Sequence, residues 1–355
     1  MSGGVDSSVT AALLLEQGYE VVGMMMRLWS EPSCDLNAPA NRCCTPAQMA
    51  DAQRVAEQLS IPFYVIDVQQ HFRDTIVQFF IDEHTQGRTP NPCLECNRQI
   101  RFTYLLNQAL ALDAHYLATG HYARIRHTAA GYQLLKGVDK NKDQAYVLHM
   151  LTQAHLAHVL FPVGEYTKAA VRQLAEKYDL PVASKSESQD LCFLGDGDYR
   201  RFLKAYQPQT AVSGPILTTT GQELGQHQGL VNYTIGQRKG LGISTPHPVF
   251  VLRKEIGQNA LIVGSREELG QQELIARDIN WIAGSPPPPG QIVQTKIRYQ
   301  AKPTPAALEL VANGRFRVKF KEPVYGITAG QGVVFFKGDQ CLGGGIIDDH
   351  TPQRN

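Results

Sequence analysis

The chain opens with SGGVDSS (residues 2–8), and the apolar, helix-like run VTAALLLEQG (residues 9–18) follows at once. A glycine pair lets the backbone turn tightly and point its N–H groups inward. The first turn of a helix adds unpaired N–H groups and the positive end of the helix dipole, and the serines add hydroxyl donors. The stretch therefore predicts a phosphate site where a helix begins.

Two features of this loop narrow its chemistry. It lacks the Gly-Lys-Ser/Thr ending of the Walker phosphate loop, whose lysine serves the terminal phosphates. A loop without that lysine is compatible with cleavage of ATP between the α- and β-phosphates, in which AMP is transferred and pyrophosphate leaves. Asp6 is the one anionic group of the loop, and beside a phosphate it indicates an intervening Mg²⁺ ion. The alternative, a glycine-rich turn that merely caps a helix, needs the whole pattern to arise by chance.

Residues 1–196 alternate between strand-like and helix-like segments. The helix at 45–59 has the clearest start, because Thr45 can cap it, Pro46 suits its first position and Gln48 completes a capping box. Strands that alternate with helices predict an α/β domain, with a doubly wound parallel sheet covered on both faces. The strands are expected at 19–26, 63–68 and 115–120, and the other helices at 72–84, 97–112, 152–161 and 167–178.

The character of the sequence changes after residue 196. Residues 213–270 are rich in glycine and turn signals, and SPPPPG (285–290) is a rigid break. Short alternating strands follow in residues 291–347, which is typical of a small barrel. We therefore expect a β-rich central domain at 197–272 and a C-terminal β-barrel domain at 273–355.

The composition is that of a globular protein. Of 355 residues, 43% are hydrophobic and 19% are charged, and the net charge is +1. No apolar run reaches the length of a membrane span and no signal peptide is visible, so we expect a cytoplasmic protein that does not contact a membrane. The chain as a whole is not a polycation, so any nucleic acid must be bound by local basic groups.

The seven cysteines are an odd number and argue against a disulfide framework. Three of them stand out. Cys93 and Cys96 form a C-x-x-C pair in TPNPCLECNRQIRF (89–102), and Cys192 lies in SESQDLCFLG (186–195). The helix after Cys96 would stabilise a thiolate there. The pair can be a redox couple, half of a metal site or two bystanders, but no second C-x-x-C exists to close a zinc site.

The loop SGGVDSS resembles the pyrophosphate loop of the N-type ATP pyrophosphatases. GRTPNPCLECNRQIRF, LATGHYARI, SQDLCFLG and HQGLVNYTIGQRKGLGI extend the resemblance, in the same order, to the bacterial tRNA-specific 2-thiouridylases over essentially the whole chain. The resemblance implies ATP-dependent 2-thiolation of the wobble uridine of tRNA. It also implies ATP and Mg²⁺ as cofactors, the tRNA anticodon stem-loop and a sulfur-donor relay protein as partners, and a monomeric enzyme.

The resemblance also assigns roles to individual residues. Cys192 matches the cysteine that carries a persulfide, and Cys96 matches the nucleophile that releases the sulfur and then forms a disulfide with the first. ATP binding is implied for Ser2, Gly3, Gly4, Val5, Asp6, Ser7, Ser8, Met26 and Gly120. Contact with the target base or the rest of the tRNA is implied for Asn91, Pro92, Cys93, His121, Lys142, Asp143, Gln144, Arg298, Tyr299 and Gln331.

The sequence departs from the family pattern in two ways, at Cys93 and in the segment before the phosphate loop. Cys93 stands where many members carry an aspartate, a candidate acid/base group, so the sequence leaves the proton-transfer role at this position open and adds a third thiol. Cys93, Cys96 and Cys192 could together hold a [4Fe–4S] cluster, and the sequence leaves open whether sulfur arrives on a cluster or as a persulfide. The strand that precedes the loop in this family is absent, so we expect residues 19–26 and 115–120 to lack a pairing partner, and a form extended upstream to be more stable.

A basic stretch supports the assignment to tRNA. Residues 291–325 contain seven basic residues against two acidic ones, which suits contact with an RNA backbone. The rival function is an amide-forming ligase of the same superfamily, which adenylates its substrate and then adds ammonia. Such a ligase requires neither paired cysteines nor a basic β-domain.

Overall fold

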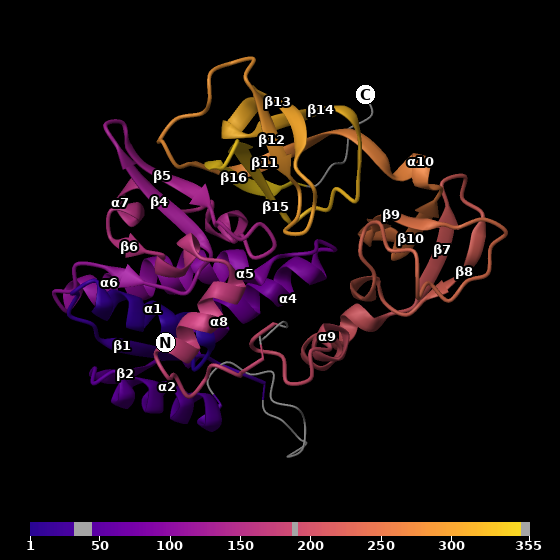
Figure 1. Cartoon of the computed structure of the whole chain (residues 1–355). Helices are drawn as coiled ribbons and strands as arrows, with labels where there is room; N and C mark the ends of the chain where they lie inside the picture. Colours follow the sequence, from indigo (N-terminus) through magenta and orange to yellow (C-terminus); the bar gives the residue numbers. More distant parts are fainter. Residues whose placement is uncertain (32–44, 187–190, 349–355) are drawn as a thin grey trace.

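The computed structural model describes residues 1–31, 45–186 and 191–348, and has three parts (Figure 1). The N-terminal part is a mixture of helices and short strands. A small sheet made from residues 214–264 stands to one side of it, joined through α9 (Tyr199–Tyr206). A barrel made from residues 270–347 sits on top.

The N-terminal part contains parallel strands, as the sequence predicts. β1 (Gly23–Arg27) pairs with β2 (Phe63–Asp67), and β3 (Leu117–Ala118) pairs with β6 (Val159–Leu160). In the described residues these two pairs are not hydrogen-bonded to each other. The Met24 carbonyl of β1 accepts a hydrogen bond from the Met1 ammonium, and the expectation that residues 19–26 and 115–120 lack a pairing partner stays a prediction.

Helices surround these strands. α1 (Val5–Glu16) follows the phosphate loop, and α8 (Lys168–Lys177) packs beside it. α2 (Pro46–Gln58) starts with the expected capping box, in which Thr45 and Gln48 bond each other's backbone N–H groups. The segment 72–84 is helical but is built from α3 (Gln69–Phe72), the π-helix η1 (Arg73–Val77) and α4 (Gln78–Thr85).

The helix expected at 97–112 is present, with a change of hydrogen-bonding pattern. α5 (Pro92–Glu95) leads into a π-helix, η2 (Cys96–Leu105), which continues as α6 (Leu106–Ala111). The prediction of a helix at 152–161 is wrong beyond the first turn. α7 (Gln153–Leu156) is capped by Thr152 and stops, and the next apolar residues form β6 instead. A short apolar run fits either period, and pairing with β3 decides between them.

The barrel closes with six antiparallel strands, because its first and last strands also pair with each other. It consists of β11 (Gly270–Trp281), β12 (Ile292–Lys296), β13 (Thr304–Leu310), β14 (Phe316–Tyr325), β15 (Gly332–Lys337) and β16 (Gln340–Ile347). The predicted C-terminal barrel is confirmed. The predicted β-rich central region is the sheet of β7 (Gly214–Thr218), β8 (Glu223–His227), β9 (Phe250–Glu255) and β10 (Ala260–Gly264).

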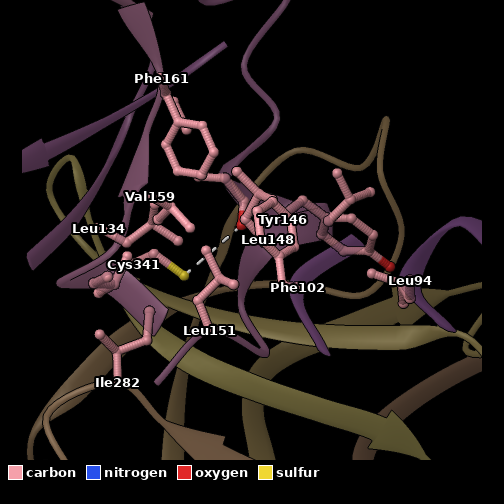
Figure 2. Close-up of a cluster of buried hydrophobic side chains, with 14 of the residues drawn as sticks. Leu94, Phe102, Leu134, Tyr146, Leu148, Leu151, Val159, Phe161, Ile282 and Cys341 are labelled. Atoms are coloured by element: carbon pink, nitrogen blue, oxygen red, sulfur yellow. Dashed lines mark hydrogen bonds between the residues drawn. The ribbon is translucent and has the colours of Figure 1, made fainter. Parts of the chain in front are cut away.

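The barrel and the N-terminal part share one hydrophobic core (Figure 2). Ile282 and Cys341 of the barrel pack there with Phe102 and Tyr146, and the Tyr146 hydroxyl donates to the Gly332 carbonyl at 2.9 Å. The hairpin of β4 (Ala123–Thr128) and β5 (Gly131–Lys136) also joins the barrel sheet by pairing with β16. These contacts fix the barrel relative to the phosphate loop. No helix in the described residues is long and apolar enough to span a membrane.

Candidate active site

The phosphate loop is held in a fixed shape. Gly3 has a positive φ of 69°, and a Cβ there would lie 2.3 Å from the Gln48 carbonyl oxygen, so only glycine fits. Gly4 is the extended N-cap of α1, and its carbonyl accepts the hydroxyls of Ser7 at 3.2 Å and Ser8 at 2.9 Å. The loop therefore arrives at the first turn of α1 already ordered, as a phosphate site requires.

A cavity of about 960 Å³ opens in front of the loop. Residues 2–7 line it, whereas Ser8 is buried and is not among the lining residues. Gly120, at the end of β3, also lines the cavity, and a Cβ there would come within 2.9 Å of the backbone of Asp6 and Ser7. Met26 is not among the lining residues and packs between two hydrophobic clusters.

Asp6 has two partners that the sequence did not reveal. Its Oδ1 accepts the Tyr122 hydroxyl at 2.7 Å and lies 2.6 Å from the Lys168 ammonium. Lys168 is the first residue of α8, which Thr167 caps, so the start of this helix directs a lysine toward the loop. An anionic residue in a phosphate loop is thus balanced by a cation from another element.

Lys185 is a second lysine at the loop. Its ammonium donates to the Gly3 carbonyl at 2.8 Å and to the Asp51 carboxylate at 2.6 Å. This hydrogen bond from Lys185 holds the pKa of Asp51 below its usual value, so Asp51 stays ionised. Both lysines line the cavity. No pattern in the sequence near 168 or 185 points to the loop, because these contacts join residues more than 130 positions apart.

The three singled-out cysteines differ in burial, and two of them share an apolar cluster. Cys96 is buried, and Cys192 is partly buried, and both belong to one apolar cluster although they are far apart in the sequence. Cys93 is exposed on α5, where Asn91 caps the helix by accepting the Cys93 N–H at 3.1 Å. The cluster around the two thiols also includes Phe72, Ile76, Phe80, Ile100, Phe193 and Phe202.

One helix links this cysteine pair to the cavity. Cys96 is the first residue of η2, and Arg101 of the same helix lines the cavity. Asn97 lies between them and is almost fully buried. Its side chain donates to the Val147 carbonyl at 3.1 Å and accepts from Arg101 at 2.7 Å. The position of Arg101 in the cavity is therefore tied to the same turn that carries the Cys96 thiol.

His121 also lines the cavity, but it is buried. Its ring lies among Phe102 and Phe161, and its Nδ1 is 2.7 Å from the Thr119 hydroxyl. Burial, with a smaller contribution from the charge of Arg101, lowers the pKa of His121 to about 3. The imidazole is therefore neutral at physiological pH, and it borders the cavity.

The remaining residues assigned to tRNA lie in different surroundings. Lys142, Gln144 and Tyr299 line the cavity. Asp143 is buried, accepts the N–H groups of Gly137 and Ala145, and has its pKa raised by burial, which suits a role in holding the backbone. The others vary in exposure: Pro92 is buried, Asn91 is half-buried, Gln331 is partly buried with its amide on the Thr89 carbonyl, and Arg298 is exposed.

The sequence suggests two metal sites, Mg²⁺ at Asp6 and a [4Fe–4S] cluster at three cysteines, and the structure gives the positions of these side chains. In the part of the chain that the structure describes, no three His, Cys, Asp or Glu side chains are grouped so as to hold a metal ion. Cys93, Cys96 and Cys192 therefore do not form a ready three-thiolate site for a cluster. Asp6 fits Mg²⁺ differently, because this ion is commonly held by one or two carboxylates together with substrate phosphates.

A phosphate loop of this kind at the start of an α/β part, followed by two β-rich parts, is the arrangement of a nucleotide-binding protein. The family model "tRNA methyl transferase HUP domain" matches residues 1–196. The tRNA methyl transferase PRC-barrel domain matches residues 200–265, and the aminomethyltransferase beta-barrel domain matches residues 271–347.

Curated relatives specify the family. The tRNA-specific 2-thiouridylase MnmA of Carboxydothermus hydrogenoformans is 47% identical over 350 residues, which cover 98% of this chain and 96% of the relative. The protein of the same name from Symbiobacterium thermophilum is 48% identical over 354 residues, which cover 98% of this chain and 90% of the relative. The chain belongs to the tRNA-specific 2-thiouridylase family.

Proposed function

We propose that this protein is an ATP-dependent tRNA-uridine 2-sulfurtransferase that converts the wobble uridine of tRNA to 2-thiouridine. One observation carries the proposal. A single helix, η2, begins at Cys96, which shares an apolar cluster with Cys192, and presents Arg101 to the cavity of the phosphate loop. An activating site and a thiol pair are thus joined as one unit, which is what sulfur transfer onto an activated base requires.

The phosphate loop serves the first half of the reaction. The C2 carbonyl of uracil is a poor electrophile, and oxide is a poor leaving group. Attack of the uracil O2 on the α-phosphorus of ATP breaks the bond to the β-phosphate, so pyrophosphate leaves and O2 becomes part of an AMP leaving group. The N–H groups of the loop and of the first turn of α1 would hold the phosphates. Asp6 would hold Mg²⁺, which supplies charge neutralisation of the phosphates.

The two cysteines serve the second half. A relay protein would supply sulfur to Cys192 as a persulfide, whose terminal sulfur attacks C2 while the bond to AMP breaks. The base is then tethered to Cys192 through an S–S bond. The Cys96 thiolate attacks the Cys192 sulfur, so the electron pair of that bond stays with the 2-thio group. The product leaves, and a Cys96–Cys192 disulfide remains to be reduced by cellular thiols.

The persulfide route fits the described residues better than a [4Fe–4S] cluster. Cys96 and Cys192 share an apolar cluster, while Cys93 is exposed on α5. The three thiols are not grouped as a metal site, so no step of the proposed reaction uses iron. Anaerobic purification with iron and sulfide analysis tests this choice: stoichiometric iron bound through the three cysteines would overturn the persulfide route.

The tRNA would approach the cavity from the side of the barrel. Tyr299 follows β12 of the barrel and lines the same cavity as Gly120 and the phosphate loop. The target base must leave the anticodon stack to reach the cavity, so the enzyme would bind a flipped base. We propose that a monomer acts in this way on the anticodon stem-loop in the cytoplasm.

Cysteine substitution tests the proposed function. Cys96→Ser and Cys192→Ser should each abolish 2-thiouridine formation while ATP binding persists, because the phosphate loop is untouched. Cys34→Ser is the matched control and should be nearly silent; this residue lies outside the described part of the chain, as do Cys43 and Cys44. Wild-type turnover in either active-site variant would refute the mechanism, and ammonia-dependent product without sulfur would favour the amide-forming ligase.

A further inference from the structure

Cys192 lies in a tight turn whose backbone is bonded to a distant segment. The Leu194 N–H donates to the Leu191 carbonyl at 3.2 Å, which closes a turn with Cys192 inside it. The next residue, Phe193, is buried, and its carbonyl accepts the Glu31 N–H at 3.1 Å. Glu31 belongs to the segment that follows β1, so this segment fixes the backbone beside the thiol.

The Glu31 side chain makes a second link to the same region, through Arg201 of α9. Arg201 Nη1 donates to one carboxylate oxygen of Glu31 at 2.8 Å, and Nη2 donates to the other, so the guanidinium holds the carboxylate by two bonds. Only 9% of the Glu31 side chain is exposed, against 43% of the Arg201 side chain. A pair with a buried partner is screened by salt much less than a surface pair.

Arg201 also bonds the residues between Cys192 and its own helix. Its Nε and Nη2 donate to the Asp196 carboxylate, and this contact lowers the pKa of Asp196, which therefore stays ionised. Asp198 caps α9 by accepting the N–H groups of Arg200 at 2.9 Å and of Arg201 at 3.2 Å. One guanidinium therefore ties together the chain that runs from the Cys192 turn to α9 and the segment after β1.

Apolar contacts join the same two segments. Trp29, of the segment after β1, packs edge-on against Phe202 of α9 with ring centres 6.4 Å apart. The Phe202 ring lies 5.7 Å from that of Phe193, and both belong to the apolar cluster that Cys96 and Cys192 share. The ion pair therefore links the two segments whose aromatic rings meet in the cluster of the thiols.

Sulfur transfer requires the Cys192 sulfur at a defined position. In the second half of the reaction the Cys96 thiolate must reach this sulfur, and a misplacement of about 1 Å in such a step can cost about 100-fold in rate. Loops are more mobile than the helices and strands that they connect, so a short turn does not reach this precision by itself. Contacts that fix the turn to the rest of the domain would supply it.

We propose that Glu31 and Arg201 form a positioning pair for sulfur transfer, which holds the turn that carries Cys192 where its sulfur can reach both the activated base and Cys96. The proposal rests on the proposed function, in which Cys192 carries the sulfur. Both residues act through the turn. Breaking the pair should therefore slow the second half of the reaction and leave the first half, at the phosphate loop, as it is.

The first test does not require turnover. The full chain is treated with iodoacetamide, and alkylation of Cys192 is followed by peptide mass spectrometry, with the exposed Cys93 as the internal reference. Arg201→Met and Glu31→Gln should each raise the alkylation rate of Cys192 by about tenfold, since hydrogen bonds between charged groups are lost. Arg200→Met is the matched control and should leave the rate unchanged, because Arg200 is exposed on the same helix and lies over the Tyr199 ring.

Two variants are used because Arg201→Met leaves a buried carboxylate without this cation, which can prevent folding. Glu31→Gln leaves no buried charge and keeps the backbone bond to Phe193, so it decides the question if Arg201→Met does not fold. Cys192 alkylation rates equal to that of Arg200→Met in the folded variants would overturn the proposal.

The second test separates positioning from a general loss of structure. In single turnover, pyrophosphate release that depends on tRNA reports the first half of the reaction, and 2-thiouridine reports the second. In Glu31→Gln and Arg201→Met, 2-thiouridine formation should fall by about tenfold or more, whereas pyrophosphate release should match that of Arg200→Met. Equal losses in both halves would overturn the positioning role. Failure of the proposed function has a different signature: the wild type would form no 2-thiouridine, while the difference in Cys192 alkylation would persist.

Discussion

At the scale of single residues, the sequence predicts what lies within one short stretch. The glycines and serines of residues 2–8 form the ordered loop that their order predicts. The contacts of Lys168 and Lys185 with the loop could not be predicted from the sequence. The residues next to a lysine do not indicate which distant residue it will contact in the folded protein. Ser8 differs from residues 2–7 because it is buried and does not line the cavity. Its hydroxyl donates to the Gly4 carbonyl instead.

Lys254 shows a further residue-scale effect that no sequence pattern reveals. It lies on β9, near the end of α4, and its ammonium is buried without a hydrogen-bond partner among the described residues. Burial lowers the pKa of Lys254 to about 8. The positive charge also lowers the pKa of the buried His84, whose own burial is the larger cause. The contact between the middle sheet and α4 therefore includes a buried positive charge, which lowers the free energy of unfolding.

We predict that Lys254→Met stabilises the protein at pH 7 by about 1–3 kcal/mol, since a shift of one pKa unit is worth about 1.4 kcal/mol. The folded-state pKa lies below the unfolded value of 10.5, so the penalty is complete below about pH 8 and declines as the pH rises toward 10.5. Urea unfolding between pH 7 and pH 10 should show this gain of stability in the wild type and not in the variant.

Lys204→Met provides the control for that measurement, because Lys204 is exposed on α9. It should leave both the stability at pH 7 and its pH dependence as they are in the wild type. A Lys254→Met variant that unfolds at the same urea concentration as Lys204→Met at every pH would show that the ammonium of Lys254 is solvated.

At the scale of elements, the sequence predicts where helices lie better than how they are hydrogen-bonded. Residues 97–112 carry a helical pattern, and a helix is there. Up to Leu105 this helix is π-helical, which the spacing of apolar residues does not distinguish from an α-helix over so short a length. The tertiary contacts of the buried Asn97 side chain occur in this segment, and π-helical segments are frequent at functional sites.

We predict that Asn97→Ala reduces both stability and thiolation. The change removes the hydrogen bonds to the Val147 carbonyl and to Arg101, and leaves a buried carbonyl without this donor. The cost in unfolding free energy should be about 1–3 kcal/mol. Thiolation should fall further than stability alone explains, because Arg101 loses a contact that holds it at the cavity. Denaturant unfolding and single-turnover 2-thiouridine formation measure the two effects.

Arg98→Ala is the matched control for this helix, because Arg98 is exposed and forms an ion pair with Glu95 of the preceding turn. An exposed pair of this kind contributes little stability. Equal single-turnover rates in Asn97→Ala and Arg98→Ala, under conditions where both are folded, would contradict a link between η2 and the cavity.

At the scale of the whole molecule, composition and strand spacing predict an α/β part and a barrel, and both are present. They do not predict the way in which the barrel is attached. β5 pairs with β16, and Leu134 and Cys341 lie opposite each other in that pairing although they are about 200 positions apart. Such contacts depend on two surfaces fitting each other, which no local pattern encodes. The shared core is what keeps Tyr299 at the cavity.

The surface charge of the barrel changes an expectation from the sequence, in which Arg298 and Lys319 are equivalent members of one basic stretch. In the structure, Lys319 lies 2.7 Å from Glu309, and Arg317 also faces acidic residues. Arg298 is exposed, and none of the ion pairs seen in the described residues involves it. It also follows the strand that leads to Tyr299 at the cavity. Arg298 and Lys319 are therefore not equivalent, because an acidic residue already faces Lys319.

We predict that Arg298→Ala weakens tRNA binding and lowers the slope of log affinity against log salt by about one, the change expected when one phosphate contact is lost. Lys319→Ala should have a smaller effect, because Glu309 already balances the charge of this lysine. Filter binding of tRNA at several salt concentrations separates the two. Arg253→Ala is the control, since Arg253 pairs with Glu255 on the middle sheet. If the slope of Arg298→Ala matches that of Arg253→Ala, the RNA backbone crosses another face of the molecule.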